Sequence, residues 1–440
     1  MEWVRQARRA SWVTNKPYDV IVYGATEYVG KHVVEELARV AQLEYEDEAN
    51  TIRWGIAGSD VDAMKKLLKD LQRDTGLQHD PNAILIANPE DESSLETVAA
   101  ATKVLINCVI PYADHGEAVV QACLKNACNH VDLSTEPQFS EGIQLKHHQV
   151  AEDMGVHVVG GCGFSSLPAD IATNYILKHY EGEVNSIEAY GTFKSYGIVP
   201  LHTSTLNAVL ETVGNLKDMH DIRRQLFPKP LPQPRSTLSA RSPVFYHENI
   251  KMWATPYSAD EAVVMRSTHY RYKADGRYPV VFRSYFAFPS LIVILGFLYG
   301  FAFLLLMAFM PFTRAIFKRF PEMISSGYFS KEGASKKQLR KMRFDTTFIA
   351  NGWPPDVDPR KSKPNKTMYI KMTGPDPTYH TSAITVVAAA ITLLREKAEC
   401  TGKGGVLTPA IAFANTDILQ RLVDRGITLS IRKQDDKFQL

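Results

Sequence analysis

The stretch from Tyr18 to Gly30 carries the clearest chemical signal in the sequence. An apolar run rich in β-branched residues ends at Gly24, and a segment with helical periodicity follows Gly30. A sharp turn at Gly24, a close helix–strand approach at Gly30 and the N–H groups of the helix N-terminus together suit a pyrophosphate. The spacing therefore predicts a strand, a tight turn and a helix that bind a dinucleotide.

Glu27 lies at the middle position of this turn, where the backbone is expected to approach phosphate. A carboxylate adds bulk and like charge, and at about 4 Å the repulsion costs on the order of 1 kcal/mol in water and several times more in a drier site. We therefore expect NAD or NADP to bind with lowered affinity.

Ser59 and Asp60 follow the second expected strand. An acid at this place can accept a hydrogen bond from a ribose 2′-hydroxyl, which favours NAD over NADP. The alternative is that Asp60 only caps the next helix.

Composition bounds the protein's class. The chain has 440 residues, 45% hydrophobic and 22% charged, with a formal net charge of +2. That length allows two or three domains, and the balanced charge gives no reason to expect a nucleic-acid partner. Five scattered cysteines show no zinc spacing and make a disulfide framework improbable, so we expect no metal site. Arg5, Arg8 and Arg9 indicate either a basic arm or a mitochondrial presequence.

Strand-like runs alternate with helical patterns through the first third of the chain, which predicts a parallel sheet with helices on both faces. After the first strand, the expected strands are Ile52–Ala57, Ala83–Ala87, Lys103–Ile110, His130–Leu133 and Val156–Gly160, and the helices are Val61–Leu71, Ser93–Ala101 and Gly116–Lys125.

After about Asp170 the pattern changes. Strand-like stretches at Ser186–Thr192 and Glu261–Tyr270 predict an α+β domain with a more antiparallel sheet. Further on, periodicity predicts helices at Ala383–Leu394 and Ile418–Val423 and a last strand at Ile427–Ile431.

An uncharged segment surrounds the apolar run Leu291–Met310. As one helix this run would be about 30 Å long, enough to cross a bilayer. We expect a hairpin that reverses near Gly296 and Gly300, or a helix lying in the membrane surface, because a single span would separate parts of one globular body. Burial in the protein or in a subunit interface is the alternative. The basic run over 331–343 is either a solvated face or a site for anionic lipid or an acidic partner.

Six short stretches are similar to motifs of the saccharopine dehydrogenase-like oxidoreductases, a family with mitochondrial and lipid-droplet members and with bacterial relatives that are trans-acting enoyl reductases. They occur in family order over nearly the whole chain. The stretches are Gly24–Gly30, Asn107–Tyr112, Asp132–Pro137, Gly163–Asp170, Gly327–Gly333 and Gly404–Ala410.

The resemblance implies a Rossmann-type α/β domain with an inserted α+β domain and NAD or NADP at the sheet's carboxyl edge. The implied parts are an arm (1–17), the Rossmann domain (18–170), a second domain (171–380) that contains the membrane-associating segment 285–312, and C-terminal helices (381–440) that return to the first domain. The implied cofactor-binding residues are Gly24, Thr26, Glu27, Tyr28, Val29, Gly30, Ser59, Asp60, Asn107, Cys108, Pro111 and Ser134.

Tyr112 and Glu136 are the candidate catalytic residues, and a capping or salt-bridged carboxylate is the alternative for Glu136. The departures from the family pattern gather around the same cleft. Where similar proteins usually carry Gly, Arg, Gly and Asp, this chain has Glu27, Ser59, Ile110 and Ser165.

Two functions follow from these patterns. The first is an NAD(P)-dependent oxidoreductase that acts on a lipid-like substrate at a membrane or lipid surface, in a mitochondrion or at a lipid droplet or the endoplasmic reticulum. The second is a catalytically weakened family member that serves as a membrane-docked structural subunit of a larger assembly.

Overall fold

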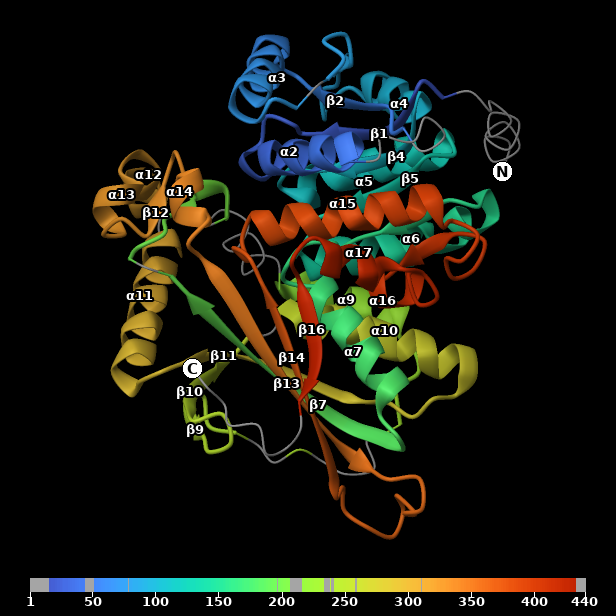
Figure 1. The fold of residues 1–440 in the computed structure, drawn as a ribbon, viewed down its shortest axis with the longest axis vertical. Coiled ribbons are helices and arrows are strands. Elements are labelled where there is room, and N and C mark those ends of the chain that lie inside the picture. Colours follow the sequence, from blue (N-terminus) through green and yellow to red (C-terminus); the bar gives the residue numbers. More distant parts are fainter. Residues whose placement is uncertain are drawn as a thin grey trace. The chain divides into compact units, whose positions relative to one another are not determined.

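The computed structural model describes residues 16–43, 51–77, 79–195, 197–205, 216–232, 238, 241–257, 259–309 and 311–432. The chain forms two compact units (Figure 1). Unit 1 comprises 1–168, 215–228 and 378–425, and unit 2 comprises 169–214, 229–377 and 426–440. The basic N-terminal cluster and the acidic stretch 44–49 lie outside the described residues.

Unit 1 contains a seven-stranded parallel sheet in the order β15-β6-β5-β4-β1-β2-β3. This confirms the predicted Rossmann-type sheet, and β15 extends it beyond the six expected strands. Its central strands are buried apolar runs, as parallel strands covered on both faces must be. The strands are β1 (Tyr18–Tyr23), β2 (Trp54–Gly58), β3 (Ile84–Ile86), β4 (Thr102–Asn107), β5 (Asn129–Asp132), β6 (His157–Val159) and β15 (Gly405–Leu407).

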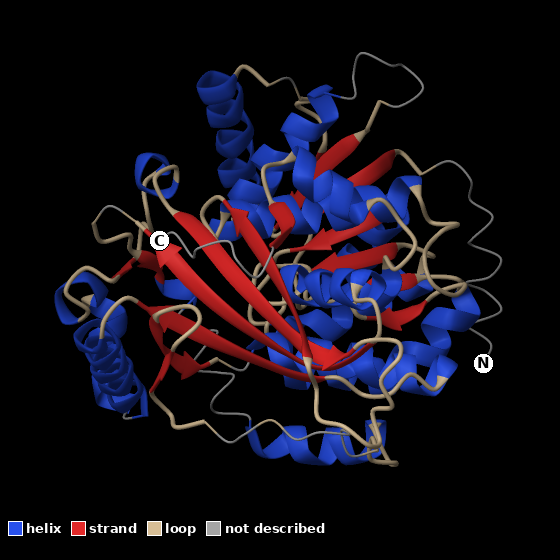
Figure 2. Ribbon diagram, turned by 60° about the horizontal axis from the view of Figure 1, so that its bottom comes forward, coloured by secondary structure: helices blue, strands red, loops and turns tan. Residues whose placement is uncertain are grey.

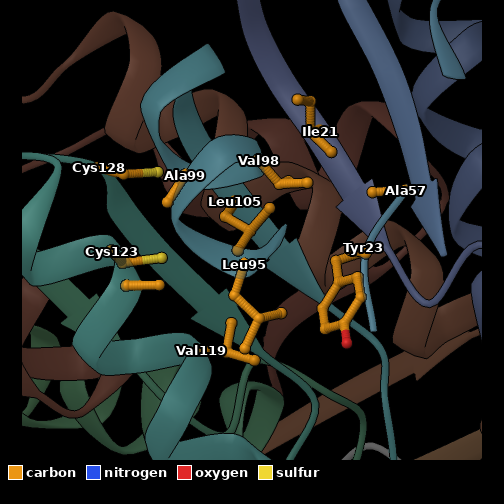
Figure 3. Close-up of a cluster of buried hydrophobic side chains, with 12 residues drawn as sticks. Ile21, Tyr23, Ala57, Leu95, Val98, Ala99, Leu105, Val119, Cys123 and Cys128 are labelled. Atoms are coloured by element: carbon orange, nitrogen blue, oxygen red, sulfur yellow. The ribbon is translucent and has the colours of Figure 1, made fainter. Parts of the chain in front are cut away.

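Helices cover this sheet. One apolar cluster of the core includes Ile21, Leu105 and Val119. Figure 3 shows Cys123 and Cys128 within this cluster, so their thiols act as small apolar side chains. The helices of unit 1 are α2 (Tyr28–Leu43), α3 (Val61–Thr75), α4 (Glu92–Ala101), α5 (Tyr112–Lys125), α6 (Pro137–Met154), α9 (Leu216–Leu226), α15 (His380–Arg395), α16 (Pro409–Ala412) and α17 (Ile418–Asp424).

α15 is buried along nearly its whole length and packs on α2, β4 and β5. A helix that is apolar on all sides must be enclosed by the protein. The C-terminal segment therefore completes the core of unit 1 up to Arg425, whereas β16 (Thr428–Arg432) pairs with β14 (Lys366–Gly374) in unit 2. The residues after Arg425 therefore belong to unit 2 and not, as expected, to the first domain. The physical reason is that β16 forms its backbone hydrogen bonds with β14, at the edge of the sheet of unit 2.

α9 lies in unit 1, although the sequence placed residues 171–380 in the second domain. It comes from the middle of the chain, yet it packs on α6 in unit 1. The Arg223 guanidinium donates bidentate hydrogen bonds to the Glu141 carboxylate, with N···O distances of 2.8 to 3.1 Å. Glu141 is fully buried. A buried carboxylate needs such a partner because its desolvation costs several kcal/mol.

We expect Arg223→Ala to lower the free energy of unfolding by about 2–3 kcal/mol, slightly less than for a fully buried pair because Arg223 is partly exposed. Urea denaturation measures the change. The double variant Glu141→Gln/Arg223→Ala should recover part of the loss, since it leaves no buried charge alone. Equal losses in the single and double variants would contradict the role of the ion pair.

Unit 2 contains a mixed seven-stranded sheet in the order β16-β14-β13-β7-β11-β10-β9, and Figure 2 draws its long strands as red arrows. This agrees with the expected α+β class. The further strands are β7 (Glu183–Lys194), β9 (Phe245–His247), β10 (Met252–Pro256), β11 (Val281–Phe288) and β13 (Arg343–Trp353), with β8 (Leu201–His202) and β12 (Phe329–Ser330) as a small second sheet. The unit's helices are α7 (Leu167–His179, which starts in unit 1), α10 (Ala259–Asp275), α11 (Leu291–Phe309), α12 (Pro311–Arg319), α13 (Pro321–Ile324) and α14 (Lys336–Leu339).

The strand expected at Glu261–Tyr270 is wrong, because this segment lies in α10. Its valines and aromatic residues suit a strand, but Asp260 and Glu261 stand in the first helical turn, where acids complement the helix dipole. Buried Val264, Ser267 and Arg271 then recur at helical spacing.

The apolar segment is a helix, α11, that ends before Pro311, where α12 begins. Gly296 and Gly300 both lie inside α11, so the expected reversal at these glycines is wrong. Ile294 is buried, and the Phe297 ring lies 5.1 Å from that of Phe288 on β11. Among the described residues, no helix combines the length and the apolarity that a membrane span requires.

Candidate functional site

The turn after β1 has a backbone that only glycine can form. Gly24 has φ of +78°, and a Cβ there would lie 2.9 Å from the Val109 nitrogen. At Gly30 a Cβ would lie 2.1 Å from the Gly24 carbonyl oxygen. The Glu27 N–H donates to that same oxygen at 3.0 Å. The turn is therefore closed by its own backbone, and α2 starts directly after it.

This turn lies where the order of the strands in the sheet reverses, between β1 and β4. β1 pairs with β2 on one side and with β4 on the other, and the Cys108 N–H donates to the Tyr23 carbonyl oxygen at 2.8 Å. The chain leaves β1 and β4 toward opposite edges of the sheet. In open α/β sheets, ligands bind at the carboxyl ends of strands at such a switch point.

Two buried polar atoms at this edge have no hydrogen-bond partner among the described residues: the Tyr23 hydroxyl and the Asn107 side-chain nitrogen. Tyr23 and Asn107 are register partners at the ends of β1 and β4, so their side chains leave the sheet on the same face. Figure 3 shows the Tyr23 hydroxyl pointing away from Ile21, at the end of the apolar cluster. Unsatisfied buried donors cost about 1–3 kcal/mol each, so this edge fits a polar ligand or water.

Glu27 brings a negative charge to the same edge. Partial burial raises the pKa of its carboxyl group, and the nearby Lys31 ammonium opposes that rise. The Glu27 charge adds to burial in raising the pKa of the Tyr23 hydroxyl and of the Cys108 thiol. The glycine turn and the unpartnered donors fit a dinucleotide, and Glu27 is the group that opposes its phosphates.

We expect Glu27→Gln to stabilise the folded chain at pH 7.5. A raised pKa in the folded state means that the parent's free energy of unfolding falls as the pH rises from the ordinary carboxyl range through the raised pKa. The variant lacks this fall, so the difference should vanish in acid, below the ordinary carboxyl pKa. Denaturant titrations at several pH values measure it. Glu90→Gln, at an exposed position, is the control, and an equal pH effect there would contradict the assignment.

The two candidate catalytic side chains already have partners. The Tyr112 hydroxyl donates to the Asn107 carbonyl oxygen at 2.9 Å and accepts from the Leu133 N–H at 3.2 Å. Burial, with the charge of Asp132, holds the Tyr112 pKa well above its usual range. The Glu136 carboxylate accepts from the Tyr112 and Ala113 N–H groups at 3.1 and 2.8 Å. Glu136 thus caps α5, the alternative left open by the sequence.

Asp132 organises this edge, and the sequence did not single it out as a site residue. One of its carboxylate oxygens accepts from the Ser134 and Gly161 N–H groups, both at 2.9 Å. The Ser134 hydroxyl in turn accepts from the Glu136 N–H. The signal in the sequence that could have identified Asp132 is an acid at the end of a buried strand. Through these hydrogen bonds Asp132 joins the loops that follow β5 and β6.

The remaining expected residues divide between the turn and its neighbourhood. Thr26, Tyr28 and Val29 lie half-buried at the start of α2, and the Tyr28 ring packs edge-on against Tyr379 at 4.6 Å. Ile110 packs against the apolar cluster around Phe139, and Pro111 precedes α5. Cys108 is fully buried, while Ser59 and Asp60 are exposed. Within the described ranges no group of three His, Cys, Asp or Glu residues could hold a metal ion.

Comparison with known proteins shows which family the chain belongs to. Residues 20–159 match the family model of the saccharopine dehydrogenase NADP binding domain. The human saccharopine dehydrogenase-like oxidoreductase is 31% identical over 424 residues, covering 94% of this chain and 97% of its own. The chain belongs to the saccharopine dehydrogenase-like oxidoreductases.

Two further comparisons fit this family. A lipid droplet localized protein of Caenorhabditis elegans is 30% identical, with 95% of this chain and 99% of its own covered. Apo saccharopine dehydrogenase (L-Glu forming) of Saccharomyces cerevisiae has a TM-score of 0.51 at 13% identity, covering 94% of this chain and all of its own, which shows a shared fold only. The family resemblance expected from the motifs is confirmed, and the matched region 20–159 includes the turn, Asn107 and Asp132.

Proposed function

We propose that this chain is a nicotinamide-dinucleotide-dependent oxidoreductase that acts on an apolar, lipid-like substrate. The observation that carries the proposal is the glycine turn at the switch point, where Gly30 approaches Gly24 so closely that no side chain fits. A glycine turn this tight after the first strand of a parallel sheet is typical of phosphate-binding turns. Membership of the saccharopine dehydrogenase-like family supports the class of reaction.

The bound nicotinamide ring would supply hydride transfer. The chain's own residues hold the dinucleotide. Gly24 to Gly30 present backbone and the N-terminus of α2 to the phosphates, and the Asn107 side-chain nitrogen and Tyr23 hydroxyl offer two free donors. Asp132 and Glu136 fix the loops around this edge through backbone N–H groups, so the donors are held before a ligand arrives.

Two parts of the proposal, the apolar substrate and the association with a lipid surface, are argued from α11. Side chains on this helix leave a large apolar area exposed, with Ile292 at 83%, Tyr299 at 78% and Leu306 at 62%. Exposed apolar patches of this kind mark interaction sites. Exposed basic residues follow in the sequence at Arg319 and from Lys331 to Arg343. Together they suit a helix that lies in an anionic lipid surface. The organelle, either a mitochondrion or a lipid droplet or the endoplasmic reticulum, stays a prediction from the sequence.

A second function is favoured by Glu27 and by the engaged Tyr112 and Glu136. Glu27 brings a like charge to the proposed phosphate turn, Glu136 caps a helix, and the Tyr112 hydroxyl is bound to backbone groups. These features fit a family member that serves as a docked subunit of a protein assembly. The two functions differ in one measurable property, the affinity for a dinucleotide.

We expect the full chain to bind NADH or NADPH with a Kd below 1 mM, about the weakest affinity that supports turnover at cellular concentrations. Isothermal titration measures it. Glu27→Gly should tighten binding by about fivefold or more because it removes the like charge from the turn. Glu90→Gly provides the control for loss of an exposed carboxylate away from the turn.

Three outcomes separate the functions. Binding by the parent chain supports the oxidoreductase. Binding only after Glu27→Gly supports the docked subunit, with an intact turn and a blocked site. No binding by a folded Glu27→Gly variant contradicts the dinucleotide site itself.

We expect the parent chain to float with vesicles of phosphatidylcholine and an anionic phospholipid. The triple variant Ile292→Glu/Tyr299→Glu/Leu306→Glu should remain in the soluble fraction, because its charges would have to enter the lipid interface. The control Ile86→Glu/Tyr272→Glu/Val423→Glu adds the same charge at exposed apolar positions elsewhere and should still float. Flotation of both variants would remove α11 from the proposal.

A further inference from the structure

The backbone after β2 lies directly beside the phosphate turn. The Gly24 N–H donates to the Ala57 carbonyl oxygen at 3.0 Å, and Tyr23 and Ala57 are register partners. β2 ends one residue later at Gly58. Ser59 and Asp60 therefore leave the sheet one strand spacing, about 4.8 Å, from the glycine turn. In this arrangement the residues after the second strand face the adenosine ribose of a bound dinucleotide.

Asp60 is held in place by the helix that it starts. One carboxylate oxygen accepts from the Ala63 N–H at 2.9 Å, and the backbone of Asp60 is extended, as a helix cap requires. The other oxygen has no partner among the described residues and Asp60 is exposed. The two readings of Asp60 that the sequence left open are thus compatible, because one oxygen caps α3 and the second remains to accept a hydrogen bond.

The charges at this edge disfavour a 2′-phosphate. The position after the last strand residue carries the Ser59 hydroxyl rather than a cation, and Asp62 adds a second acid to the first turn of α3. Asp60 also occupies an N–H group of α3 that would otherwise attract an anion. On α2, Lys31 lies near the opposite charge of Glu27. The first lysines of α3, Lys65 and Lys66, follow the acids of its first turn.

We propose that Ser59 and Asp60 make this chain selective for NAD(H) over NADP(H), unlike the NADP-binding domain whose model it matches. The proposal rests on the proposed function. Asp60 accepts a hydrogen bond from the ribose 2′-hydroxyl, and its charge repels the phosphate that replaces this hydroxyl in NADP. The expected preference is on the order of tenfold or more in Kd.

Titration of the purified full chain with NADH and with NADPH, followed by nicotinamide fluorescence, tests the proposal. Asp60→Asn keeps a residue that caps helices and loses the charge, so its preference for NADH should fall toward unity. Ser59→Arg/Asp60→Asn adds a cation and should bind NADPH more tightly than NADH. Asp62→Asn removes a neighbouring charge from the same helical turn and should leave most of the preference. If the parent binds too weakly, all variants are repeated in the Glu27→Gly background.

The outcomes distinguish this inference from the function on which it rests. Equal or tighter binding of NADPH by the parent chain overturns the selectivity, and so does an effect of Asp62→Asn as large as that of Asp60→Asn. Both results leave the oxidoreductase standing. Failure of both nucleotides to bind, even with Glu27→Gly, overturns the proposed function and the selectivity with it.

Discussion

The site depends on one close approach, that of α2 to the end of β1. Gly30 lies so near the Gly24 carbonyl oxygen that any side chain at position 30 would overlap it. This contact sets the direction in which α2 leaves the sheet and therefore where its N-terminus points. The same carbonyl oxygen accepts from the Glu27 N–H, so the turn cannot open without losing a hydrogen bond.

A second level of organisation comes from carboxylates that bind backbone rather than substrate. Asp132 joins the loops after β5 and β6, and Glu136 caps α5 across the edge of the sheet. Each accepts from two backbone N–H groups, and such charge-assisted hydrogen bonds are worth more than a surface ion pair. Asp132 and Glu136 thus fix the loops of this edge, whereas the Tyr23 hydroxyl and the Asn107 side-chain nitrogen have no hydrogen-bond partner in the part of the chain that the structure describes.

Glu27 is in tension with this arrangement. Its carboxyl is partly desolvated at the place where a phosphate is expected, and its raised pKa records the cost of keeping the charge there. Sites that violate a local rule in an otherwise consistent fold are commonly functional or strained. Here the violation lies in the turn that the sequence predicts for a dinucleotide, so the measured dinucleotide affinity, rather than the fold, separates the two proposed functions.

The sequence alone determined the strand, glycine turn and helix at Tyr18–Leu43 and the family, because these depend on local backbone conformation and on motifs read in order. It left Glu136 open, since the N–H groups that its carboxylate accepts from come from a segment 23 residues away. It also left Asp60 open, because a cap of the local helix can still accept a hydrogen bond from a ligand. It misassigned α10, whose valines suit a strand until a packing partner selects the helix. Only the tertiary structure brought α9 onto α6 through Glu141 and Arg223, 82 residues apart, because a carboxylate as deeply buried as that of Glu141 needs a cation that only the fold can bring to it.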